Sequence, residues 1–213
     1  MCIRDRLYIG LVVVIFLILH YSQASTKGRA GERIVARQAK SLGKDYVLLN
    51  NITLPNRNGG TAQIDHIVLS PYGIFVLETK HYRGDIYGKE DQKQWEQKFV
   101  KSSYKFYNPI TQNRSHVNIL SHHLLGLADP TQTHSIVIFT GKCRLRSRVP
   151  PYVFNGRRWL RYVRKQFRDV VYTEHEVQMM KERIESVALE DTRATDKQHK
   201  KYAKKQKRRW KLF

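Results

Sequence analysis

Three side chains of the segment QIDHIVLSPYGIFVLETK, residues 63–80, could act together in chemistry. Asp65 lies near one outer end of two apolar runs that fold about SPYG, and Glu78 and Lys80 lie near the other outer end. In a hairpin with a two-residue loop at the centre of SPYG, Asp65 stands opposite Glu78, where Cβ atoms are roughly 4.5 to 5.5 Å apart. Two carboxylates this close repel each other unless a proton, an ammonium group or a divalent cation lies between them.

The turn itself leaves a second register open. A bulge at Gly73 would shift the pairing by one residue and set Asp65 opposite Thr79. The chemistry favours the first register, because it ends an apolar face in a charged cluster and also places Lys80 beside Gln63.

The charged cluster itself has two interpretations. In the first, Lys80 balances the two acids at a strand end and the cluster is structural. In the second, hard carboxylate oxygens hold Mg²⁺ (or Mn²⁺), an ion that keeps several waters and accepts phosphate oxygens. A lysine beside such an ion can position a water or help to deprotonate it, and the ion neutralises charge on the phosphate under attack. The second interpretation predicts a phosphodiester hydrolase.

Length and charge agree with a polyanionic partner. The chain has 213 residues, enough for one domain with appendages, and carries 39 Lys and Arg against 18 Asp and Glu. This excess favours nucleic acid or an anionic membrane surface as the partner. The two cysteines, Cys2 and Cys143, lie far apart, which excludes a zinc ribbon and a disulfide framework.

An apolar run, LYIGLVVVIFLIL at residues 7–19, precedes the rest of the chain. We expect residues 1–25 to form a single-pass membrane anchor; a cleaved signal peptide or a buried strand or helix are the alternatives. The first six residues, MCIRDR, resemble the translated read-through of a sequencing adapter, so they are interpreted as non-native and the span as truncated. The run is followed closely by the basic residues Lys27, Arg29 and Arg33. Their position predicts that the remaining chain lies in the cytoplasm.

The patterns after this run predict a mixed α/β fold, with a mixed central sheet flanked by helices. A helix should end near Gly43, and strands are expected at 46–54, in both halves of 63–80, at 84–88 and at 134–141. KEDQKQWEQ, residues 89–97, is too charged for a central strand and is assigned to a connection. Helices should begin at Pro109 and, with a capping box, at Thr173.

Two basic segments complete the chain. Residues 144–168 contain nine Arg and Lys and no acid, interleaved with aromatic residues, a combination that fits nucleic acid because cations hold phosphates and rings stack on bases. The nucleic-acid-binding candidates are Arg157, Arg158, Arg161, Arg164 and Lys165. The tail, residues 191–213, is expected to be disordered unless it is bound to DNA or to anionic lipid.

Several separated motifs resemble the nuclease-related domain (NERD) of the PD-(D/E)XK restriction-endonuclease-like nuclease superfamily. Asp65 followed by Glu78-Thr79-Lys80 is similar to its D…(D/E)xK signature, and GER at 31, YVLLNNITLP at 46 and NPITQNRSH at 108 match in order. The resemblance covers about residues 30–140 and implies a restriction-endonuclease-like core.

The resemblance also implies roles for particular residues. Asp65 and Glu78 become metal ligands with the carbonyl of Thr79, Lys80 the catalytic lysine and Glu32 the first-helix acid that completes the site. Gln112 and His116 resemble a QxxxY element in which histidine replaces tyrosine, and both are candidate accessory residues. Gln63 is a third candidate because of its place in the hairpin.

The predicted organisation is therefore an anchor at 1–25, a nuclease-related domain at 30–145, a basic helical extension at 146–190 and a basic tail at 191–213. The function expected is a membrane-tethered, cytoplasm-facing, magnesium-dependent nuclease acting on DNA, with RNA as a further substrate. The alternatives are a non-catalytic nucleic-acid-binding module with the same fold and a membrane-associated assembly protein. The sequence leaves the oligomeric state and the mode of cutting open.

Overall fold

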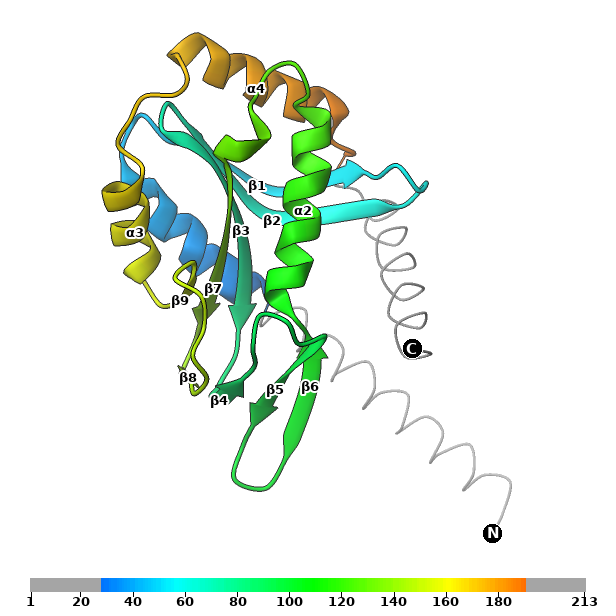
Figure 1. The fold of residues 1–213 in the computed structure, drawn as a ribbon, viewed down its shortest axis with the longest axis vertical. Helices are drawn as coiled ribbons and strands as arrows, with labels where there is room; N and C mark the ends of the chain where they lie inside the picture. Colours follow the sequence, from blue (N-terminus) through cyan, green and yellow to red (C-terminus); the bar gives the residue numbers. More distant parts are fainter. Residues whose placement is uncertain (1–27, 191–213) are drawn as a thin grey trace, which may run out of the picture.

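The computed structural model describes residues 28–190, and Figure 1 shows their arrangement. The predicted anchor at 1–25 and the predicted tail at 191–213 lie outside the described residues. Within residues 28–190, no helix combines the length and the apolar character that crossing a bilayer requires.

The larger of two sheets has five strands in the order β1-β2-β3-β7-β9. β1 (Val47–Pro55), β2 (Thr61–Ser70) and β3 (Gly73–His81) are antiparallel neighbours, whereas β7 (Thr133–Thr140) and β9 (Val153–Asn155) continue the sheet in parallel with β3. The predicted strands in this region are confirmed, and the sheet is mixed. Central strands β3 and β7 are apolar on both faces, as expected for strands covered on both sides by helices.

The β2–β3 hairpin adopts the first of the two registers considered from the sequence. Ser70 pairs with Gly73 and His66 with Leu77, so two residues form the loop and no bulge shifts the pairing. The Ser70 hydroxyl donates to the Gly73 carbonyl at 3.0 Å, and Gly73 has a φ of 133° that a side chain would disfavour. The turn thereby fixes which residues of β2 and β3 share a face.

A second sheet corrects the expectation of a single central one. It has four strands in the order β6-β5-β4-β8: β6 (Ser103–Tyr107), β5 (Gln94–Lys98), β4 (Gly84–Tyr87) and β8 (Cys143–Leu145). The fourth strand predicted at 84–88 is confirmed, but the assignment of residues 89–97 to a connection is wrong for its second half. Trp95 explains the difference, because it is 1% exposed and stacks on Phe139, so one buried ring docks an otherwise polar strand.

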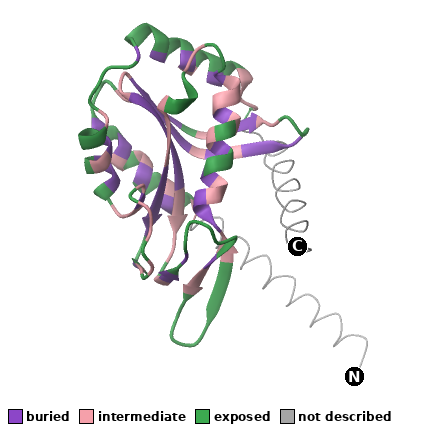
Figure 2. Cartoon of the chain, in the orientation of Figure 1, coloured by how far each residue is buried: buried purple, intermediate pink, exposed green. Residues whose placement is uncertain are grey.

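Helices cover both faces of the larger sheet (Figures 1 and 2). α2 (Pro109–His123) and α4 (Glu174–Val187) pack on one face, where residues such as Leu120 and Met180 meet Ile67 and Val76. A first helix over residues 28–39, continued by a 3₁₀ turn at Lys40–Leu42, and α3 (Arg158–Gln166) cover the other face. A short 3₁₀ turn, Pro130–Gln132, leads from α2 to β7. The mixed α/β architecture with flanking helices is confirmed.

Helix ends follow the predicted signals. Pro109 opens α2, and Thr173 and Glu176 form the reciprocal capping box at the start of α4. The helices of the basic extension belong to the same packing unit as the strands, since Trp159 and Val163 of α3 and Val177 and Ile184 of α4 join the two core clusters.

Candidate active site

Asp65 and Glu78 lie where the α2-facing side of the β2–β3 hairpin changes from apolar to charged. On that side Ile67 and Leu69 of β2 follow Asp65 in steps of two, and Ile74 and Val76 of β3 precede Glu78. Glu78 is only 1% exposed. The hairpin therefore carries a buried carboxylate to the edge of the hydrophobic core, at the end of the apolar face where the sequence predicted a charged cluster.

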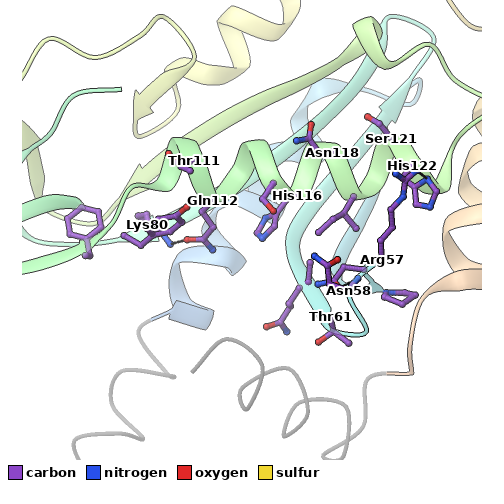
Figure 3. A pocket seen from close by; sticks show the side chains of 18 of the residues that line it. Arg57, Asn58, Thr61, Lys80, Thr111, Gln112, His116, Asn118, Ser121 and His122 are labelled. Atoms are coloured by element: carbon purple, nitrogen blue, oxygen red, sulfur yellow. Dashed lines mark hydrogen bonds between the residues drawn. The ribbon is translucent and has the colours of Figure 1, made fainter. Parts of the chain in front are cut away.

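Lys80 is held by two acceptors from different elements. Its Nζ donates to Glu78 Oε1 at 2.6 Å. It also donates to Gln112 Oε1 at 2.9 Å (Figure 3). Gln112 lies in the first turns of α2, so this helix fixes the lysine against the strand. Gln112, a candidate accessory residue, is thus brought into direct contact with the predicted catalytic lysine.

His116 lies one turn further along α2 and faces the same acid. Its Nδ1 is 3.4 Å from Glu78 Oε2, a distance suited to an ion pair when the imidazole is protonated. The geometry does not make this contact a hydrogen bond, and Glu78 Oε2 accepts none from any described residue. Glu78 therefore has one oxygen committed to Lys80 and one that faces His116.

Asp65 is fixed by the backbone of the neighbouring strand. Thr79 N–H donates to Asp65 Oδ2 at 2.7 Å. Burial, and then the nearby Glu78 carboxylate, raise the pKa of Asp65 well above its usual value, although Lys80 and this hydrogen bond oppose the rise. The Glu78 charge thus disfavours the charged form of Asp65.

Lys80 is a stable cation in this setting. Burial alone lowers the pKa of an ammonium group, but the Glu78 carboxylate, Tyr82 and Asp65 outweigh it and raise the pKa of Lys80 above its ordinary value. The amine is consequently protonated near neutral pH.

Glu32 joins the same electrostatic cluster from the opposite helix layer. Burial, followed by the Glu78 charge, raises its pKa. The first helix approaches closely because residue 31 is glycine: a Cβ there would lie 2.7 Å from His81 Cβ and 2.9 Å from Thr140 Oγ1. The tight contact brings Glu32 to the strand ends that carry Glu78 and Lys80.

Polar anchors hold α2 in the position that presents Gln112. The Asn108 side chain caps the helix by accepting from Ile110 N–H at 2.9 Å, and it donates to the carbonyls of Glu90 and Gln92. Asn113, fully buried, donates to Val76 O at 2.8 Å and to Ile136 O at 3.2 Å. The helix is therefore tied to β3 and β7 directly behind the site.

A groove of about 1100 Å³ opens over the site. Its lining includes Lys80, Gln112 and His116 at one end. Arg57 and His122 line the other end (Figure 3). Within residues 28–190 no Asp or Glu side chain belongs to this lining, so Glu78 and Asp65 lie beneath it. The charged side chains of the lining are basic: Arg57, Lys80 and Lys105.

The remaining predicted residues lie in different places. Gln63 lines the groove, where its Nε2 donates to Asn51 Oδ1. The predicted nucleic-acid-binding residues at 157–165 are all exposed and lie on α3 or directly before it. Because α3 packs on the face of the sheet opposite α2, these residues do not contact Lys80. They are Arg157, Arg158, Arg161, Arg164 and Lys165.

Several groove residues were not predicted from the sequence, among them Tyr82, Arg57 and His122. Tyr82 continues the two-residue period of Glu78 and Lys80 and lies within electrostatic range of both; burial raises the pKa of its hydroxyl. This two-residue spacing was the sequence signal that could have identified Tyr82. Arg57 and His122 carried no such signal, because a hairpin turn and a helix end meet only in the folded chain.

Metal ligation by Asp65, Glu78 and Thr79 stays a prediction. Within residues 28–190, no three His, Cys, Asp or Glu side chains are grouped as metal ligands. The acids nevertheless offer hard oxygens to a cation, among them the buried Glu78 Oε2 that accepts no hydrogen bond from the described residues.

The fold and the site define a mixed α/β protein with an acid–lysine cluster beneath a basic groove. The chain belongs to the nuclease-related domain family, whose model matches residues 27–140, more than half of the chain. It is also similar to an uncharacterized protein of Bacillus anthracis, with 36% identity over 119 residues, 55% of this chain and 56% of that protein. The chain thus spans about half the length of the curated relative it matches. No solved structure matches it.

Proposed function

We propose that this chain is a metal-dependent nuclease that hydrolyses phosphodiester bonds in DNA and, as a further substrate, RNA. The observation that carries the proposal is the arrangement of Lys80, held by Glu78 and Gln112 next to Asp65 at the floor of a basic groove. Membership of the nuclease-related domain family supports the same class of chemistry.

Lys80 would act on the phosphate as a cation. Because neighbouring acids raise its pKa, the ammonium group is retained at neutral pH and can stabilise negative charge that develops on phosphate oxygens. It can also donate to an attacking water and orient it, while Gln112 keeps the ammonium directed at the groove. Proton removal by Lys80 is disfavoured unless the Glu78 contact is released.

Asp65 and Glu78 would hold Mg²⁺ or Mn²⁺ with the carbonyl of Thr79, and Glu32 would support the cluster from the first helix. The donor set fits, since carboxylate and carbonyl oxygens are the ligands these ions prefer. When bound, the ion supplies positive charge that neutralises the phosphate under attack. A restriction-endonuclease-like core would place these groups at the end of a hairpin, as they lie here.

A cleavage assay tests the proposal with the full chain. Plasmid and single-stranded DNA are incubated with Mg²⁺ or Mn²⁺, and parallel reactions contain EDTA. We expect cutting that needs the divalent ion and falls at least about 100-fold in Glu78→Gln and in Lys80→Ala. A matched control is the pair Glu96 and Lys98, which has the same spacing on β5 and lies 3.3 Å apart on the surface.

Two outcomes decide the matter. Cutting that is lost in the β3 variants and retained in Glu96→Gln and Lys98→Ala supports hydrolysis by this site. Tight binding of DNA without cutting in any divalent ion would overturn it and favour the alternative, a non-catalytic nucleic-acid-binding module.

We also propose that residues 1–25 tether the chain to a membrane, with the nuclease-related domain in the cytoplasm. The support is the apolar run at 7–19 and the basic residues that follow it. Alkaline extraction of membranes from cells that express the full chain tests this: retention in the membrane pellet supports the anchor, and release overturns it.

A further inference from the structure

The end of the groove furthest from Lys80 holds an arginine with an unusual partner. Arg57 Nη2 lies 2.7 Å from His122 Nδ1. A guanidinium can only donate, so the His122 nitrogen accepts and the imidazole is neutral in this contact. Arg57 forms no ion pair with any acid of residues 28–190, and its charge is therefore not balanced by the described part of the protein.

The backbone around Arg57 is fixed rather than free. It lies in the turn between β1 and β2, where Asn56 Oδ1 accepts from Asn58 N at 3.0 Å and from Gly60 N at 2.9 Å. The preceding Pro55 carbonyl lies 2.8 Å from His123 Nε2, which ties the turn to the end of α2. Arg57 is thus presented at a set place while its side chain stays exposed.

The groove connects this arginine with Lys80 along α2 (Figure 3). Gln112, which contacts Lys80, and His122, which contacts Arg57, are ten residues apart on one helix, or about 15 Å at 1.5 Å per residue. The phosphates of one strand are spaced about 3.4 Å along the axis of duplex DNA, so this distance corresponds to roughly four nucleotides in a duplex and to fewer in an extended single strand. Polar side chains without charge line the interval, among them Asn118 and Ser115.

We infer that Arg57, oriented by His122, binds a second backbone phosphate of the same polynucleotide strand whose scissile phosphate lies at Lys80. The inference rests on the proposed function for the class of substrate, and it adds a minimum length: a strand must extend up to about four nucleotides from the cutting point to reach both Lys80 and Arg57. Arg57 positions the strand and takes no part in the reaction.

Binding is measured apart from cutting, on the full chain in EDTA, with fluorescent oligothymidylates of about 3 to about 16 nucleotides. Wild-type affinity should rise about fivefold to tenfold once the oligonucleotide is long enough to span both cations, and Arg57→Ala should remove this step. For single strands the salt dependence of the logarithm of affinity should fall in magnitude by about 0.7 in Arg57→Ala, the value for one lost phosphate contact. Arg57→Lys should keep most of the salt dependence.

Arg37→Ala is the matched control, because Arg37 is an exposed arginine on the opposite face of the sheet. Equal weakening by Arg37→Ala and Arg57→Ala, or a wild-type affinity that does not change in a step with length, would overturn the second phosphate site. If the protein cleaves DNA but its affinity shows no Arg57-dependent step with length, the second phosphate site is overturned and the hydrolytic proposal stands. A step that depends on Arg57, in a chain that cuts nothing with Mg²⁺, would support this site and overturn hydrolysis.

Discussion

Glu78 and Lys80 form a buried ion pair between residues two apart on one strand, with 2.6 Å between Oε1 and Nζ. The carboxylate side chain is 2% exposed and the lysine side chain 17%. Two charges withdrawn from water stabilise the fold only while they remain together, since either one left alone is buried without compensation.

Breaking this pair should therefore cost stability as well as activity. Lys80→Met is expected to lower the free energy of unfolding by about 3 kcal/mol, because it leaves Glu78 next to Asp65 without its counter-ion. The double variant Glu78→Gln/Lys80→Met should recover at least about 1 kcal/mol of the summed single losses in urea unfolding. Lys98→Met, in the exposed pair with Glu96, should change stability by less than about 1 kcal/mol. Additive single losses at Glu78 and Lys80 would contradict the coupling.

Gly31 should be intolerant of any side chain. A methyl group there would meet His81 Cβ at 2.7 Å and Thr140 Oγ1 at 2.9 Å, so Gly31→Ala must push the first helix away from the strand ends. We expect a loss of about 1 to 3 kcal/mol in thermal unfolding and a loss of cleavage of about tenfold or more, as Glu32 is displaced. Among residues 28–190, a Cβ at Gly28 would meet Glu32 Oε1 alone, at 3.7 Å, so Gly28→Ala should be neutral or slightly stabilising. Similar effects at both glycines would refute this account.

Asn113 should control the position of α2. Asn113→Ala leaves the carbonyls of Val76 and Ile136 without this donor, and we expect it to lower unfolding free energy by about 2 kcal/mol. Cleavage should fall further than folding alone explains, because Gln112 precedes it on the helix and holds Lys80. Asn118→Ala, an exposed asparagine on α2, serves as the control for stability. An unchanged melting temperature in Asn113→Ala would exclude the anchoring role.

His66 makes stability dependent on pH. Burial lowers the pKa of His66 to about 4, below the ordinary 6.5, while its Nδ1 lies 2.8 Å from Asn50 Oδ1. The unfolded chain binds the proton more readily, so the contribution is present above about pH 6.5 and is lost as pH falls toward 4. Between pH 7 and pH 4.5, wild type should lose on the order of 2 kcal/mol more than His66→Gln in urea unfolding. His175→Gln, exposed on α4, should track wild type.

The two apolar runs about SPYG were sufficient to predict the β2–β3 hairpin, and the charged cluster at their ends favoured the register that the structure has. Shifting the pairing by one residue would have turned Ile67 and Val76 out of the core, so burial decides what the SPYG turn left open. Asp65, Glu78 and Lys80 followed from that register. The contact between Gln112 and Lys80 lies beyond such reasoning, because it depends on how α2 packs against a strand far away in sequence.

The second sheet illustrates a different limit. Strand β5 buries a single large ring, Trp95, among polar residues, and its partners on both sides are short. No local period marks such a strand, and only the stacking of Trp95 on Phe139 of β7 explains its place. The place of Arg57 at the end of the groove was likewise not predicted, because it also depends on contacts between distant parts of the chain.

The parallel pairing of β3 with β7 has a consequence for the order in which the candidate site assembles during folding. The hairpin that carries Glu78 and Lys80 is a local structure, but Asn113 locks α2 to Ile136, a residue of β7, and β7 closes the sheet from a distant part of the chain. Such long-range closure is slow and comes late in folding. During synthesis on the ribosome, a nascent chain that ends before about residue 140 would lack the β7 anchor of α2, so Gln112 would be held against Lys80 only after that strand has emerged.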